Sequence, residues 1–398
     1  MTRPPVTSLD VAGRRLVVRA DLRLPAARGK KAPGSDVVAL ADWLRPLLHQ
    51  GASATILFRD ARGAGTEAAE ATLARQLGKA LGVTVRRTGL PAADATRAAA
   101  LALGPGDVLL SANLSAVAEA DDGDDPTLAA AVAALGDIHV DDAFALSDRR
   151  MATTTGAAAL MQASLGGRHT AERAAIAEFL SAAAAPAVAV VGGGTLAARA
   201  DLLKALLGTF DTICLGGGVA NAFLAADGAP MGRSAPRPRD VELARKLARQ
   251  ARQSGTTLLL PTDLVIAREL RPNARKQVIA ADACPPEGFI LDIGPQTLRE
   301  YQGELAEARR ILFTGPVGAV DLPPFDRSSC LLARSIGELT RADLCHSLAG
   351  GEATVRIIGL AGAGEDFTHI STGGDAFVRH AASCLATARP RRSDGKAA

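Results

Sequence analysis

The sequence predicts an α/β protein made of two doubly wound parallel-sheet (Rossmann-like) domains joined by a hinge helix. Three observations support this fold class. Short β-branched runs alternate with Ala-, Leu- and Arg-rich helical stretches along nearly the whole chain, a pattern typical of parallel sheets that helices cover on both faces. The 398 residues exceed what one hydrophobic core usually organises. Glycine clusters follow several expected strands, and open α/β sheets bind ligands beyond the carboxyl ends of their strands.

Residues 1–169 are expected to form the first domain. A strand is expected wherever a short apolar run is bounded by turn residues, and a helix wherever apolar residues recur with a period near 3.6. The helical pattern is clearest over Val37–His49 and Thr66–Leu81. The strands expected in this domain are Arg15–Ala20, Ala52–Phe58, Val83–Val85, Asp107–Leu110 and Ile138–Val140.

Residues 170–186 lie between the two domains and have the pattern of a helix. Thr170 is a suitable N-cap, and Ile176, Phe179 and Leu180 form one apolar face. Pro186 closes the segment. We therefore expect a stiff connecting helix and not a flexible linker.

Residues 187–375 are expected to form the second domain, and residues 376–398 a C-terminal helix and polar tail that return to the first domain. The alternation of strands and helices continues through this half. Its expected strands are Ala187–Val191, Thr212–Leu215, Thr256–Leu260, Gln277–Ala280, Arg310–Phe313 and Val355–Ile358.

Composition excludes several classes of protein. The net charge is only +3, which argues against a dedicated binder of nucleic acid or membrane surfaces. Aromatic residues make up 3% of the chain, too few for base-stacking platforms. The 5 cysteines form no CxxC pair and the 6 histidines no i, i+4 pair, so a metal site built by the protein is not expected. With no signal peptide and no long apolar run, we expect a cytoplasmic protein.

Four glycine clusters follow expected strands of the second half. At such positions glycine lets backbone amides approach a phosphate, and a helix N-terminus adds its dipole. A tight turn between a strand and a helix would explain any one cluster, but four in one domain favour a phosphate-bearing ligand. The clusters are Gly192–Gly194, Gly216–Gly218, Gly315–Gly318 and Ser371–Gly374.

Two common phosphate motifs do not account for this pattern. Residues 192–197 fit GxGxxA, the dinucleotide fingerprint, but the acidic ribose partner should end the next strand. That strand ends in glycines, and its acidic residue, Asp211, lies at the opposite end. No GxxxxGK[ST] sequence occurs either. The sequence therefore disfavours both a dehydrogenase and a Walker-type ATPase.

The order of the motifs resembles the phosphoglycerate kinase family over nearly the whole chain. Each motif is short, but their order and spacing together are specific. The motifs are Val18–Pro25, Val140–Phe144, Thr153–Gly156, Leu215–Leu224, Leu260–Asp263, Leu291–Thr297, Phe313–Gly318, Pro323–Phe325 and Ser371–Gly374.

This resemblance implies the two-domain phosphoglycerate kinase fold and a monomeric glycolytic transferase that binds ATP or ADP with Mg²⁺ and a small phosphorylated acid. The first domain would bind the acid through Asp21, Arg23, Arg59, Arg62 and Arg149. Glu352 would contact the metal, and the groups at the transferring phosphoryl would be Arg199, Gly373 and Gly374. The nucleotide would be bound by Gly193, Gly194, Thr195, Gly217, Gly218, Thr314, Pro316, Gly318, Asp321 and Gly351.

Several charged positions depart from the family pattern. Asp36 and Ser115 stand where the family has arginines, Arg23 where it has asparagine, and Arg59 where it has histidine. In the second domain the departures are Thr195 and Arg199 at lysine positions, Asp321 at a glutamate position, and Glu352 with Ala353 in place of the Asp-Thr pair.

Two hypotheses follow. The first is a phosphoglycerate kinase of reduced or altered activity. The second is an inactive homologue that keeps nucleotide or anion binding and acts in sensing or partner contact. The arginines of the first domain either form a rearranged anion pocket, with Asp36 paired to Arg23, or are solvated surface residues.

Overall fold

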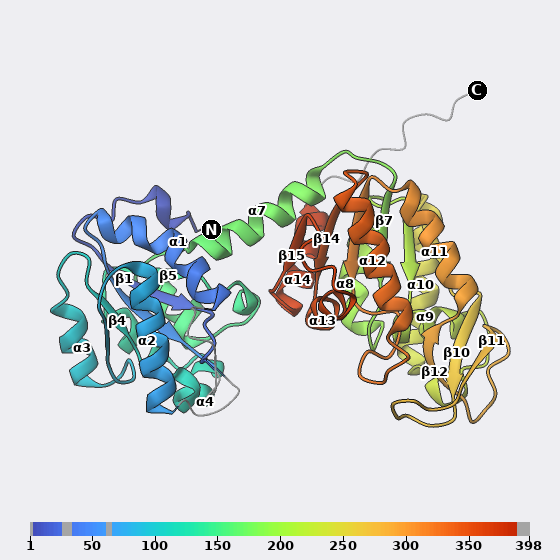
Figure 1. Ribbon diagram of the computed structural model, residues 1–398, viewed down its shortest axis with the longest axis horizontal. Coiled ribbons are helices and arrows are strands. Elements are labelled where there is room, and N and C mark those ends of the chain that lie inside the picture. The colour runs from blue at the N-terminus through green and yellow to red at the C-terminus, as the bar shows by residue number, and fades with distance from the viewer. Residues whose placement is uncertain (1–2, 26–33, 61–65, 388–398) are drawn as a thin grey trace. The chain divides into compact units, whose positions relative to one another are not determined.

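The structure is a computed structural model that describes residues 3–25, 34–60 and 66–387. The chain divides into two compact units, Met1–Ala174 and Ala175–Ala398. Each unit is built around a six-stranded sheet in which every neighbouring pair of strands is parallel, and helices cover the sheets (Figure 1). This arrangement confirms the predicted α/β fold class. The boundary between the units falls within helix α7 (Gly167–Ser181).

The first unit has the strand order β3-β4-β2-β1-β5-β6. Successive residues of β1 point to opposite faces, so Leu16 and Val18 pack with α1 and α2 while Val17 packs with α5 and α6. The strands are β1 Arg15–Ala20, β2 Ser53–Phe58, β3 Val85–Arg87, β4 Val108–Leu110, β5 Ile138–Asp141 and β6 Gln162–Leu165, and the helices are α1 Ser35–His49, α2 Glu67–Leu81, α3 Asp94–Leu101, α4 Ala118–Asp122, α5 Pro126–Ala133, the π-helical turn η4 Ala152–Gly156 and α6 Ala157–Leu160.

The second unit has the strand order β15-β14-β13-β7-β8-β9. Its central strands β7 and β13 are buried at every residue, as expected for a parallel sheet covered on both faces. The strands are β7 Ala187–Val191, β8 Thr212–Leu215, β9 Thr257–Leu259, β13 Arg310–Thr314, β14 His346–Gly350 and β15 His369–Ser371, and the helices are α8 Ala200–Leu206, α9 Gly217–Ala226, α10 Pro238–Ser254, α11 Pro295–Glu307, α12 Arg327–Arg341, α13 Glu352–Ala361 and α14 Asp375–Thr387.

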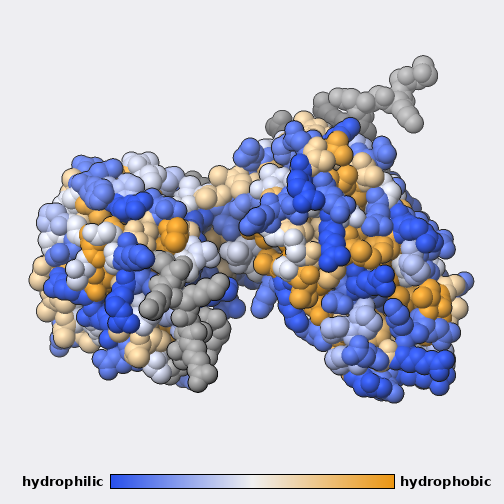
Figure 2. Space-filling view, viewed as in Figure 1, coloured by the Kyte–Doolittle hydropathy of each residue, from blue (hydrophilic) through white to orange (hydrophobic). Residues whose placement is uncertain are grey.

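A small antiparallel sheet lies beside the second parallel sheet, in the order β11-β10-β12. It comprises β10 (Asp263–Ala267), β11 (Lys276–Ala280) and β12 (Phe289–Ile293). The segment expected as strand 277–280 is thus found as β11, but outside the parallel sheet. Only residues 268–275 connect it to β10, and a parallel crossover needs about a dozen or more. β11 is largely exposed, in a region of the second unit where hydrophilic side chains predominate (Figure 2).

The strand expected at Val355–Ile358 is wrong, because these residues lie within α13. The buried residues of this segment are Thr354, Ile357, Ile358 and Ala361, which is the spacing of one helix face. The strand of this region is β14, the preceding His-Ser-Leu-Ala-Gly segment. The residues of β14 have low strand propensity, so the strand is stabilised mainly by its burial between β13 and β15.

The connecting helix α7 begins earlier than predicted. Thr170 is not its N-cap, because the Thr170 N–H already donates to Gly166. The carboxylate of Asp142 caps the helix instead, accepting from the backbone N–H groups of Arg168 at 2.8 Å and His169 at 3.4 Å. At the other end, Arg310 Nη1 donates to the carbonyls of Phe179, Leu180 and Ala182. The predicted apolar face, Ile176, Phe179 and Leu180, is buried.

The C-terminal helix α14 packs against α8 of the second unit. Residues 388–398, in which the expected tail lies, are outside the described residues, so the return of the tail to the first domain stays a prediction. Among the described residues, no helix has the length and apolar character required to span a membrane.

Candidate functional site

Three glycine turns meet at the carboxyl ends of β13, β7 and β8, which are neighbours in the second sheet. Backbone hydrogen bonds join the turns: the N–H of Gly193 donates to Pro316 O at 2.9 Å, and that of Gly217 to Val317 O at 3.0 Å. Gly193 and Gly217 both have positive φ, a conformation that favours glycine. Three of the four clusters singled out from the sequence therefore form one continuous backbone surface.

Packing explains some of these glycines but not all. A Cβ on Gly192 would overlap Pro316 O, and a Cβ on Gly218 would overlap Gly194 O. Gly194 differs, because a Cβ built there would meet no atom within 4 Å, and its φ is not positive. The absence of a side chain at Gly194 therefore leaves open space above the turn instead of relieving a clash.

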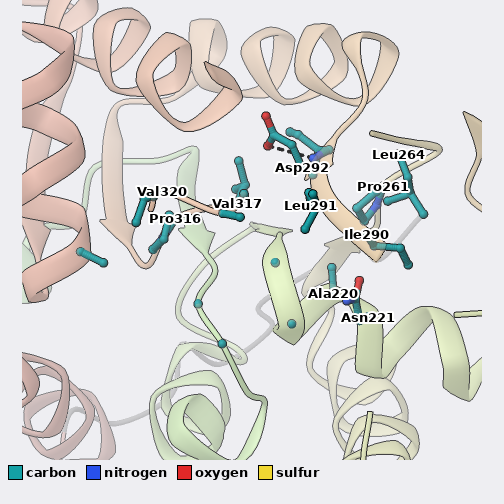
Figure 3. Close-up of a pocket in the computed structure, with 18 of the residues that line it drawn as sticks. Ala220, Asn221, Pro261, Leu264, Ile290, Leu291, Asp292, Pro316, Val317 and Val320 are labelled. Atoms are coloured by element: carbon teal, nitrogen blue, oxygen red, sulfur yellow. Dashed lines mark hydrogen bonds between the residues drawn. The ribbon is translucent and has the colours of Figure 1, made fainter. Parts of the chain in front are cut away.

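That space is part of a hollow of about 390 Å³ in the second unit (Figure 3). Its opposite wall is mostly apolar and comes from α9, β10, β12 and the 317–320 loop. A polar backbone floor beside an apolar wall suits a ligand with phosphate groups and a flat apolar part. The predicted residues that line it are Gly193, Gly194, Gly217, Gly218, Pro316, Gly318, Asp321 and Arg199; the wall residues that we did not predict include Ala220, Asn221, Pro261, Leu264, Ile290, Leu291 and Val320.

Three predicted nucleotide-binding residues do not line the hollow. Thr195 is exposed in the turn just beyond Gly194. Thr314 is buried at the end of β13, and its hydroxyl has no hydrogen-bond partner among the described residues. Gly351 lies against it, since a Cβ there would be 3.7 Å from Thr314 Oγ1. Thr314 and Gly351 are thus neighbours at the ends of β13 and β14.

Arg199 is the one cationic side chain among the residues that line this hollow. It ends the short turn η5 (Ala197–Arg199), and its Nη1 lies 3.8 Å from Asp375 Oδ1. Its Nε is buried, with no hydrogen-bond partner among the described residues, and lies 3.7 Å from where a Cβ of Gly193 would be. Desolvation by burial lowers the pKa of Arg199. A desolvated guanidinium beneath a glycine turn is well placed to meet an anion.

The predicted catalytic glycines lie near Arg199. Gly373 and Gly374 precede Asp375, the first residue of α14, and Asp375 is the carboxylate that faces the Arg199 guanidinium. The N–H of Gly373 donates to Ser371 Oγ at 3.2 Å, and Gly374 has positive φ. The structure therefore brings Arg199, Gly373 and Gly374 together at the N-terminus of one helix.

Two acidic groups at this site already have partners within the second unit. Asp292 accepts from the backbone N–H groups of Ile293 at 2.9 Å (Figure 3) and of Ser328 at 3.1 Å. Burial raises the pKa of Asp292 to about 7. Asp321 is exposed and forms an ion pair with Arg356 of α13.

Glu352 is the exposed first residue of α13, beside Ala353, which lines the hollow. Among the described residues, no group of three His, Cys, Asp or Glu side chains could hold a metal ion. Mg²⁺ commonly binds through one or two carboxylates plus substrate phosphates. Glu352 could therefore be one carboxylate ligand of a metal ion that is bound mainly by the phosphates of a nucleotide.

The first unit is different, because one of its predicted substrate-binding arginines, Arg59, is paired with carboxylates. Arg59 forms a two-pronged pair with Asp122, both N–O distances being 2.8 Å, and lies 3.6 Å from Asp121. The hydrogen bonds to Asp122 raise the pKa of Arg59 and lower that of Asp122. Arg62 lies outside the described residues.

Three further first-unit positions have structural roles. Asp36 accepts from the backbone N–H of Arg23 at 2.7 Å, so the expected pairing involves the Arg23 main chain and leaves its side chain exposed. Ser115 Oγ donates to Asp60 O at 2.7 Å. Asp21 is half-buried, and its carbonyl accepts from Arg168 Nη1 at 3.0 Å. The remaining predicted residue, Arg149, is exposed at a separate hollow of the first unit.

Known proteins resemble this chain along almost its whole length. The family model described as phosphoglycerate kinase matches residues 6–382. The phosphoglycerate kinase of Cereibacter sphaeroides is 35% identical over 374 residues, which cover 93% of this chain and 94% of that protein. That of Agrobacterium fabrum is 34% identical over 376 residues, or 93% of each chain.

Solved structures agree with these relatives. The phosphoglycerate kinase of Coxiella burnetii has a TM-score of 0.78 at 28% identity and covers 96% of this chain and 99% of its own. The enzyme of Pyrococcus horikoshii, at 22% identity with a TM-score of 0.71 over 97% of this chain and 98% of its own, has the same fold. Fold, motif order and full-length similarity lead to one conclusion: this chain belongs to the phosphoglycerate kinase family.

Proposed function

We propose that the protein binds ADP or ATP with Mg²⁺ in the second-unit hollow and transfers a phosphoryl group between 1,3-bisphosphoglycerate and ADP, at a lower rate than typical kinases. The observation that carries this proposal is the meeting of three glycine turns around a hollow whose one lining cation is Arg199. Family membership supports the reaction class.

Phosphoryl transfer depends on positioning and on neutralising charge that develops on the transferred group. Here the amides of the Gly193–Gly194 turn and the N-terminus of α14 would face that charge, with Arg199 supplying a positive group. Bound Mg²⁺ would neutralise nucleotide phosphates, with Glu352 as a carboxylate ligand. Thr195 supplies a hydroxyl and no charge, so we expect a reduced rate.

A second candidate is an inactive homologue that retains nucleotide binding and acts as a sensor. The observation that favours it is the state of Arg59, whose guanidinium is already paired with Asp122 and adjacent to Asp121. A guanidinium held by two carboxylates is a weaker anion ligand than a free one. This candidate predicts ADP binding without turnover.

A coupled assay with the full chain, ATP, Mg²⁺ and 3-phosphoglycerate separates the two candidates. Typical kinases turn over at about 1–100 s⁻¹. We expect measurable turnover below that range, and calorimetric binding of Mg-ADP. Binding without turnover would support the sensor, whereas failure of both nucleotides to bind at millimolar concentration would refute both candidates.

A further inference from the structure

The guanidinium of Arg199 is shared between the second-unit hollow and a carboxylate that lies outside it. Its Nε and Nη2 are 3.7 and 3.8 Å from where a Cβ of Gly193 would be, and Gly193 lines the hollow. Its Nη1 lies 3.8 Å from Asp375 Oδ1, and Asp375 does not line the hollow. One edge of the guanidinium therefore faces the glycine turn, while its third nitrogen faces a carboxylate of the chain.

The two partners of this pair differ in burial. The side chain of Arg199 is 15% exposed, whereas that of Asp375 is 74% exposed. Burial lowers the pKa of Arg199, and the charge of Asp375 acts in the opposite direction. A desolvated cation is costly unless an anion faces it, so Asp375 serves as the counter-ion of Arg199.

The two carboxylates that line the hollow have partners elsewhere. Asp321 forms an ion pair with Arg356, and Asp292 accepts from backbone N–H groups. Within the described part of the chain, Asp375 is the one carboxylate that forms an ion pair with Arg199.

Asp375 also lies at the start of a helix. It is the first residue of the 13-residue α14 and the acidic residue of its first turn. The N-terminal end of a helix dipole favours negative charge. The proposed function brings the transferring phosphate to this same helix end, next to Arg199. The carboxylate of Asp375 is therefore held by both of the groups that would attract that phosphate.

We propose that Asp375 competes with the nucleotide phosphates for Arg199 and so lowers the affinity of the second-unit hollow for Mg-ADP. The inference rests on the proposed function, because that function supplies the phosphates. One guanidinium cannot fully neutralise a carboxylate and a phosphate together, so a bound phosphate weakens the pair with Asp375. The exposed carboxylate then turns into solvent, while buried Arg199 binds the phosphate through its Nε and Nη2 edge.

Calorimetry with Mg-ADP on the full chain tests this role. Asp375→Asn removes the charge and keeps the size of the side chain. Its Kd for Mg-ADP should be about threefold to tenfold lower, because a pair with a desolvated guanidinium is stronger than a fully exposed one. Asp375→Glu keeps the charge and should bind as weakly as the unmodified protein. Circular dichroism checks that both variants fold.

Asp201→Asn is the matched control. Asp201 is also an exposed acid in the first turn of a helix, α8, but it pairs with Lys204 and does not line the hollow. Its loss should change the Kd for Mg-ADP less than about twofold. An equal gain of affinity in Asp201→Asn and Asp375→Asn would reveal a general effect of net charge and overturn the proposal.

A double-mutant cycle shows whether Asp375 acts through Arg199. In an Arg199→Gln background no guanidinium remains to be shared, so adding Asp375→Asn should lower the Kd less than about twofold. A merely structural role of Asp375 would not produce this dependence. The same gain of affinity with and without Arg199 would refute competition for the guanidinium.

The outcome is separable from that of the proposed function. Tighter Mg-ADP binding by Asp375→Asn in a protein without turnover would refute the kinase and support this inference. Turnover with an unchanged Kd for Mg-ADP in Asp375→Asn would support the kinase and refute the inference. If neither the unmodified protein nor Asp375→Asn binds Mg-ADP at millimolar concentration, both are refuted.

Discussion

The candidate sites of the two units differ in the groups that form them, which are mainly backbone in the second unit and side chains in the first. In the second unit the floor of the hollow is backbone, and glycines hold it open through close packing and positive φ. In the first unit the expected anion-binding groups are side chains, and one of them, the Arg59 guanidinium, is paired with carboxylates instead. A backbone site tolerates divergence because its shape depends on few side chains. A site of charged side chains is remodelled by single substitutions.

The largest effect is expected where the second unit does depend on a side chain. Arg199→Gln should lower kcat by about 10²–10³, as loss of one preorganised donor at a reacting anion does. Steady-state assays measure this, with nucleotide affinity measured in parallel. Lys204→Gln is the control, because Lys204 pairs with Asp201 and does not line the hollow. An equal fall in both variants would contradict the role of Arg199.

Two alanine substitutions test whether the glycine turns are held by packing or kept open for a ligand. Gly218→Ala forces a methyl against Gly194 O and should destabilise the unit by about 1–3 kcal/mol. Gly194→Ala meets no atom within 4 Å, so its melting temperature should change little while Mg-ADP binding weakens. Thermal unfolding and calorimetry measure the pair. Unchanged ADP affinity in Gly194→Ala would show that no ligand approaches that turn.

Much of the second-unit site could be predicted from the sequence. The glycine positions follow from local strand–turn–helix order, and the structure brings Gly193, Gly217 and Pro316 together because β7, β8 and β13 are neighbours. The strand at residues 355–358 was mistaken because its three β-branched apolar residues, Val355, Ile357 and Ile358, fit a short strand as well as a helix.

The first-unit contacts were not predictable. Asp122 lies 63 residues from Arg59, and Asp142 caps α7 from 26 residues away. His169 and Arg173 carried no motif, and only the folding of β5, η4 and α7 places them with Arg149. Long-range pairing of side chains depends on packing, and local patterns do not encode it.

Each unit also contains a buried carboxylate at a helix start, and Asp142 gives a pH test. Burial raises its pKa to about 7, from 3.8. The folded state then binds more protons than the unfolded state between these values, so the Asp142 contribution to stability falls as pH rises through this window. Asp142→Asn keeps a carbonyl acceptor for the N–H groups of Arg168 and His169.

We therefore expect the stability of Asp142→Asn relative to the unmodified protein to rise by on the order of 1–2 kcal/mol between pH 5 and 7. Urea unfolding at several pH values measures it. Asp137→Asn is an opposite-sign control, because the hydrogen bond to Arg15 lowers the pKa of Asp137. Its stabilising contribution is lost as pH falls. Parallel curves for all three proteins would exclude titration of Asp142 in this range.

The smallest expected effect on kcat concerns which unit limits the rate of turnover. Thr195 is exposed in the glycine turn, so a lysine fits there without repacking. If the missing charge in the second unit limits the reaction, Thr195→Lys should raise kcat about tenfold, with little change in the KM for 3-phosphoglycerate. Thr195→Gln, similar in reach but uncharged, should not. If kcat stays the same in both variants while Mg-ADP still binds, turnover is limited by the first unit, where Arg59 is paired with Asp122.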